Sequence, residues 1–119
     1  MAKYEKHLTG DFDAFLDYLF DGIMNGSMSA SYEDGSEWNA GGVRVAVRVF
    51  ERYSFMGSNR VSLSLTLVGQ GGHLFLSAIT SGGSQAVFWK VNTIGEESFL
   101  ECVEKLAEGY AAGDTLPED

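Results

Sequence analysis

The chain has 119 residues, a mass of 12.9 kDa and a formal net charge of −9, from eight Lys and Arg against 17 Asp and Glu. This length fits one domain with its own core. Hydrophobic residues make up 45% of the chain, which excludes a disordered segment, a collagen-like repeat and a coiled coil. The acidic balance argues against nucleic acid and anionic membranes as partners, because both attract basic surfaces.

Cysteine content and the N-terminus bear on the compartment. Cys102 is the only cysteine, so no internal disulfide can form, and its helical surroundings favour a buried core residue over a reactive thiol. Residues 1–7 lack the apolar run of a signal peptide. No stretch reaches the roughly 18 apolar residues of a membrane span. We therefore expect a cytoplasmic protein.

The first strong element is a helix over residues 11–25, after a weak edge strand over 3–9. Apolar residues recur there at steps of three and four, which marks one face of a helix. These residues are Phe12, Phe15, Leu16, Leu19, Phe20 and Ile23. Asp11 is the expected N-cap, and Asn25-Gly26 the expected end.

A series of strands follows the helix. Residues 27–38 predict either one irregular strand or a short hairpin turning at Asp34-Gly35, and residues 39–42 predict a loop. Alternating or apolar patterns then predict strands over 43–54, 60–68, 73–80 and 86–91.

The helical period returns over residues 94–111. Thr93 and Glu96 match a capping box at its start. The acidic tail 114–119 is expected to be loose, and no repeat or linker divides the chain. We therefore expect a single domain over residues 1–113.

These elements predict an α+β fold: an antiparallel meander of five to six strands, with both helices packed on one face. This two-layer arrangement is similar to the helix-grip folds. We expect the valine row 43–49 and the apolar row 61–67 to face the helices together. The basic residues Arg44, Arg48 and Arg52 then lie on the opposite face, beside Ser62, Ser64 and Thr66.

This arginine strip has two interpretations. The side chains pair with Glu33, Glu37 or Glu51 and cover apolar surface with their stems. Alternatively, they bind an anion or the acidic helix of another subunit. The turn Ser81-Gly82-Gly83-Ser84 could add backbone amides to an anion site if it lies near Arg52.

No other motif indicates a chemistry. His7 and His73 stand apart from any metal-ligand spacing, and the chain has no Gly-x-Ser-x-Gly nucleophile elbow. The glycines at 69–72 precede a predicted strand rather than a helix, so they do not form a dinucleotide fingerprint. We predict no metal, no cofactor and no catalytic residues, and we favour a binding role over an enzymatic one.

Several short motifs together resemble a bacterial family of unknown function, made of proteins of about this length. They are Arg52-Tyr53-Ser54, Arg60-Val61-Ser62-Leu63, Ser81-Gly82-Gly83-Ser84-Gln85 and Gly95-Glu96-Glu97. The resemblance covers about residues 4–110. It implies a compact cytoplasmic domain with no assigned activity.

Two functional hypotheses follow. In the first, the chain is a homo-oligomeric or interaction module whose arginine-bearing sheet face, with Phe50 and Phe88 as further candidates, pairs with a second copy. In the second, an apolar pocket between sheet and helices binds a small ligand. The aromatic residues expected to line that pocket are Phe15, Phe75, Phe88, Trp89 and Phe99.

Overall fold

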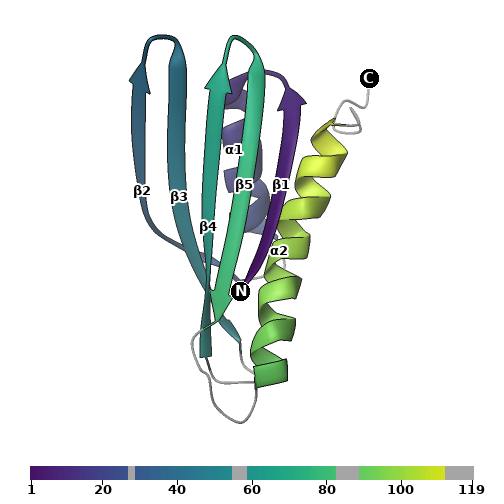
Figure 1. The fold of residues 1–119 in the computed structure, drawn as a ribbon. Helices are drawn as coiled ribbons and strands as arrows, with labels where there is room; N and C mark the ends of the chain where they lie inside the picture. The colour runs from purple at the N-terminus through teal and green to yellow at the C-terminus, as the bar shows by residue number, and fades with distance from the viewer. Residues whose placement is uncertain (27–28, 55–58, 83–88, 112–119) are drawn as a thin grey trace.

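The computed structural model describes residues 1–26, 29–54, 59–82 and 89–111. Its elements are β1 (Ala2–Thr9), α1 (Phe12–Asn25), β2 (Ser31–Ala40), β3 (Val43–Ser54), β4 (Asn59–Gln70), β5 (His73–Gly82) and α2 (Trp89–Ala111). The five strands form one antiparallel sheet in the order β1-β5-β4-β3-β2 (Figure 1). Strands β2 to β5 are a meander, and β1 joins it beside β5. The predicted α+β fold is confirmed.

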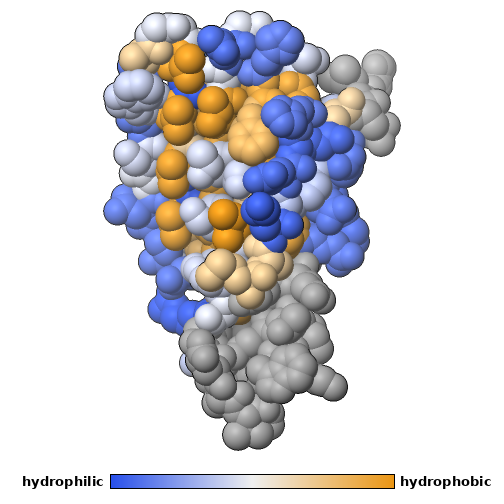
Figure 2. Space-filling model, viewed as in Figure 1, coloured by the Kyte–Doolittle hydropathy of each residue, from blue (hydrophilic) through white to orange (hydrophobic). Residues whose placement is uncertain are grey.

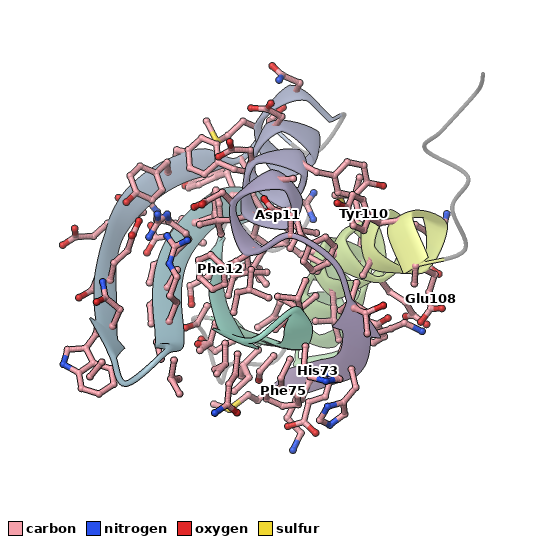
Figure 3. The ribbon with its side chains drawn as sticks, turned by 90° about the horizontal axis from the view of Figure 1, so that it is seen from above. Asp11, Phe12, His73, Phe75, Glu108 and Tyr110 are labelled. Atoms are coloured by element: carbon pink, nitrogen blue, oxygen red, sulfur yellow. The ribbon has the colours of Figure 1, made fainter. Side chains whose placement is uncertain are left out.

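Both helices pack on the same face of the sheet. α2 lies against β5, β1 and β4, and α1 lies against α2 and β4. The sheet bends toward the helices along β2 and β3, so its concave side faces them (Figure 3). One core joins the two layers, with fully buried side chains such as Phe15 of α1, Leu65 of β4 (1% exposed) and Phe99 of α2.

α1 begins and ends as its sequence predicts. The Asp11 carboxylate accepts a hydrogen bond from the Ala14 amide at 2.9 Å and so caps a free N–H of the first turn. The apolar residues at steps of three and four, among them Phe15, Leu19 and Ile23, are fully buried. Burial of this stripe accounts for the helix and for its orientation on the sheet.

Polar contacts tie α2 to its neighbours. Glu108 accepts hydrogen bonds from the Tyr4 hydroxyl at 2.5 Å and from Lys6 Nζ at 3.0 Å, both on β1. The Tyr18 hydroxyl of α1 donates to the Leu106 carbonyl at 2.7 Å. These hydrogen bonds from Tyr4 and Lys6 lower the pKa of Glu108.

The β3–β4 register overturns one prediction. Arg44 pairs with Gly69, Arg48 with Leu65 and Arg52 with Val61. Directly opposed residues share a face, so the arginine strip lies on the helix-facing side, with the buried row of β4. The valines of β3 lie on the other face.

The error has a simple physical origin. Both strands alternate, and a shift of one residue in their pairing moves a whole row to the other face. On the helix-facing side, Ala46 and Phe50 fill the core between the arginines, whose long stems reach toward its margin.

β2 is a single strand. Its pairing with β3 shifts between Tyr32 and Asp34, which is a β-bulge rather than the turn of a hairpin. It continues through Ala40, where a loop was expected, and Gly41 and Gly42 form the turn with φ of 59° and 84°. Consecutive positive φ values match a two-residue type I′ hairpin turn.

α2 begins earlier than predicted. Residues 89–91, expected at the end of a strand, form its first turn, and residues 93–96 lie inside the helix rather than at its cap. A short apolar run does not distinguish a strand from a helix, which explains the mistake. The rest of the expected strand, at 86–88, and the tail at 114–119 lie outside the described residues.

Candidate functional site

The sheet face opposite the helices is called the open face here, since none of the described helices covers it. Register places one row of each strand on it. Its members include Lys3, Glu5, His7 and Thr9 of β1, His73, Phe75, Ser77, Ile79 and Ser81 of β5, Arg60, Ser62, Ser64, Thr66, Val68 and Gln70 of β4, Val43, Val45, Val47, Val49, Glu51 and Tyr53 of β3, and Asp34, Ser36, Trp38 and Ala40 of β2. Figure 2 shows apolar side chains gathered over its central strands, with hydrophilic ones along the margins.

One apolar row crosses all five strands. It runs from Trp38 through Val45, Val68 and Phe75 to His7, each residue directly opposite the next. Trp38 is 62% exposed, and the His7 and Phe75 ring centroids are 4.8 Å apart. Val45, Val68 and Phe75 are partly buried, and a continuous apolar row that still reaches solvent is typical of an interaction surface.

A parallel row four residues away along each strand ends in opposite charges. It runs from Asp34 through Val49, Ser64 and Ile79 to Lys3. Lys3 makes an exposed ion pair with Glu5 at 3.6 Å. The face therefore has small side chains along β4, apolar ones on both sides of it, an acidic β2 margin and a cationic group at the β1 margin.

The arginines of the helix-facing side are largely neutralised. Arg44 donates to both carboxylate oxygens of Asp13 on α1, at 2.8 and 2.9 Å, and its guanidinium lies 4.3 Å from the Phe12 ring centroid. The pKa of Asp13 is lowered by this hydrogen bonding and charge. Arg44 thus joins β3 to the first turn of α1 and does not form a free anion site.

Arg48 is held even more closely. It donates to Glu37 of β2, to the Val47 carbonyl at 3.0 Å and to the Ser36 carbonyl at 3.4 Å. Its side chain is 16% exposed. The predicted pairing with glutamate is confirmed for Arg48, on the opposite face from the one expected.

Arg52 lies at the other end of the strip. Its guanidinium carbon is 5.9 Å from the Phe99 ring centroid, and its buried Nε has no hydrogen-bond partner among the described residues. Arg52 and Gly82 both pair with Val61, so they share one end of the sheet. Ser81, however, points to the open face and bonds the Ser62 hydroxyl at 2.9 Å. Gly83 and Ser84 lie outside the described residues.

A second surface feature is a groove between α1 and the β2–β3 hairpin, called here the α1–β2 groove. It is open to solvent and has a volume of about 510 Å³. Its lining comes from Leu16, Asp17 and Phe20 of α1, Tyr32, Gly35, Ser36 and Glu37 of β2, and Arg48 of β3. Sequence patterns did not point to it, because the groove depends on how far β2 bends toward α1.

Aromatic rings build one end of the groove. Phe20, Tyr32 and Phe50 form a cluster with centroid separations of 5.2 to 5.7 Å. A side chain at Gly35 would come within 2.5 Å of the Tyr32 hydroxyl, so glycine at this position makes room for the Tyr32 ring.

The aromatic residues expected to line a pocket lie elsewhere. Phe15 and Phe99 are fully buried in the core, and Phe75 is on the open face. Phe88 and the side chain of Trp89 lie outside the described part of the chain. None of the three described residues lines the α1–β2 groove.

Cys102 is half-buried rather than in the core. It lines a hollow of about 380 Å³ between α1 and α2, and burial raises the pKa of its thiol. Within the described ranges, no group of three or more His, Cys, Asp and Glu residues could hold a metal ion. No described helix is long and apolar enough to cross a membrane.

Comparison with known proteins agrees with the resemblance found in the sequence. The family model DUF6054, described as a family of unknown function, matches residues 1–111. No curated protein and no solved structure matches the chain.

Proposed function

The chain belongs to the DUF6054 family, whose function is unknown, and we propose that it is an interaction module that self-associates through its open face. The observation that carries this proposal is the continuous apolar row from Trp38 to His7 on an uncovered sheet. Exposed apolar area of this kind gains free energy when a second surface removes it from water. This interface replaces the arginine face predicted from the sequence, which lies on the helix-facing side of the sheet.

The size of the face fits a dimer. Five strands about 4.8 Å apart, with about ten residues of about 3.3 Å each, span about 24 Å by 33 Å, or up to about 800 Å². A standard stable interface buries about 800 Å² on each partner. A second copy of the chain is therefore large enough to cover the open face.

The pattern of the face is self-complementary about one axis. β4 is the central strand, and a two-fold axis along it would set β3 over the partner's β5 and β2 over the partner's β1. Val45 then meets the partner's Phe75, and Asp34 meets the partner's Lys3. Because the sheet bends away at β2, the closest contact falls on β3, β4 and β5, and longer side chains reach across the margins (Figure 3).

Light scattering on purified protein tests the proposal. We expect a mass twice 12.9 kDa for the native chain and 12.9 kDa for Val45→Lys, which places a charge in the centre of the apolar row. Ala14→Lys is the matched control, with the same added charge at an exposed position of α1. A native monomer at high concentration, or a Val45→Lys protein that still dimerises, would contradict the proposal.

We place this association in the bacterial cytoplasm. The single cysteine, half-buried and with a raised thiol pKa, suits a reducing compartment in which structural disulfides are not used.

A further inference from the structure

We infer that the α1–β2 groove binds a small organic cation, an ammonium group carried on an apolar or aromatic body. This site lies on the helix-facing side of the sheet, so it does not depend on the proposed dimer. The inference rests on the shape of the groove, on its aromatic wall and on which of its charges are already paired.

The groove has the size and lining of a ligand site. Its volume of about 510 Å³ lies within the usual range for small-molecule sites, about 300–1,000 Å³. Leu16 and Phe20 are four residues apart on α1 and so share one helix face, while Tyr32 faces them from β2. They offer an apolar wall and two aromatic rings.

The paired charges exclude an anionic ligand. Arg48 is the basic residue of the lining, and both of its terminal nitrogens already donate to groups of β2 and β3. Capturing an anion would require breaking its bond to Glu37 and leaving that carboxylate beside the new negative charge. Such an exchange therefore costs free energy, because it leaves the carboxylate of Glu37 without its partner.

The remaining carboxylate favours a cation. Asp17 lines the groove, is exposed, and forms no ion pair or hydrogen bond with the described residues. It lies one helical turn from Phe20, so one ligand can place its charge at Asp17 and its body against the rings. Aromatic faces also attract cations directly. The net charge of −9 further raises the local concentration of cations.

Titration with 2-phenylethylammonium chloride, followed by amide NMR shifts, tests the inference. We expect saturable shifts at Phe20, Tyr32, Gly35 and Ser36, and no saturation with 2-phenylethanesulfonate, which has the same body and the opposite charge. Asp17→Asn should weaken ammonium binding about two- to fivefold, as the loss of one exposed ion pair does.

Asp21→Asn is the matched control. It removes the same charge from an exposed position one turn along α1, outside the groove lining, and should leave the affinity close to that of the native chain. Three results would overturn the inference. They are no saturable shifts with millimolar ammonium probe, equal binding of the sulfonate, and equal weakening by both variants.

Discussion

The ion pair between Arg44 and Asp13 joins strand β3 to helix α1. The bidentate geometry, at 2.8 and 2.9 Å, holds the first turn of α1 over β3, and the guanidinium also covers the Phe12 ring. The alternation of β3 alone left two interpretations of its arginines open, pairing with glutamates and binding of an anion or a second subunit. The contact of Arg44 with Asp13 across the two layers, and that of Arg48 with Glu37 on the neighbouring strand, show that both arginines are paired.

The Arg44–Asp13 pair makes stability depend on pH. The pKa of Asp13 is lowered in the folded state, so its contribution is present above the ordinary aspartate pKa and is lost as pH falls through the folded value. We expect the native chain to be more stable than Asp13→Asn at pH 7. That difference should begin to shrink as pH falls below about 3.9, the ordinary aspartate pKa, and should disappear once the pH is below the lowered pKa of the folded state.

Urea unfolding of both proteins across this pH range measures the effect. Asp21→Asn, which removes a similar exposed charge from the same helix, serves as the control and should show no such loss. A constant difference between native and Asp13→Asn proteins down to pH 2 would disprove the role of the pair.

At the scale of elements, glycine sets how closely the two helices approach. A Cβ at Gly22 of α1 would lie 2.6 and 2.7 Å from both methyl carbons of Leu106 on α2 and 3.2 Å from its Cγ. The whole Leu106 side chain, rather than one end of it, would have to move. At Gly109 of α2 the nearest atom is the Tyr18 hydroxyl oxygen at 3.7 Å, an ordinary contact.

Two alanine substitutions should therefore have opposite effects. Gly109→Ala should stabilise the fold by up to about 1 kcal/mol, the usual gain in helix propensity. Gly22→Ala gains the same propensity but overpacks the helix contact, at a cost of about 1–3 kcal/mol, and should be destabilising overall. Thermal unfolding of both variants compares them, and a stabilised Gly22→Ala protein would show that the helices do not pack this closely.

At the scale of the whole molecule, the two proposed functional surfaces lie on opposite sides of the sheet. The open face carries the proposed contact with a second copy, and the α1–β2 groove lies on the other side of the sheet. A dimer formed through the open face therefore leaves both grooves accessible. Binding at the groove and self-association can be measured separately in the same protein.

A charge exchange tests the two-fold axis along β4. With that axis, Lys3 lies across from the partner's Asp34. Lys3→Asp or Asp34→Lys alone should raise the dimer dissociation constant about two- to fivefold for each of the two symmetric pairs. The double variant should recover most of the lost affinity. Sedimentation equilibrium measures the dissociation constants. Losses that add in the double variant would exclude this axis.

Local sequence patterns determine most of the elements of this chain. The stripe from Phe12 to Ile23 predicts α1, and strict alternation predicts β3 and β4 to within two residues at either end. These patterns depend only on the 3.6- and 2-residue periods of the backbone, so one chain segment is enough to read them. The short runs at residues 27–38 and 86–91 carry too few repeats to decide their structure.

Tertiary structure alone decided which face each strand row occupies and what stands opposite it. From β3 alone, the row that contains Val45 and the row that contains Arg44 could each face the core, because a one-residue change of register exchanges the two rows. The pairing of Arg44 with Gly69 turned the valines outward and created the open face, while the bend of β2 toward α1 created the groove. Both surfaces are formed by residues that are distant in sequence, so the periodicity of a single segment does not predict them.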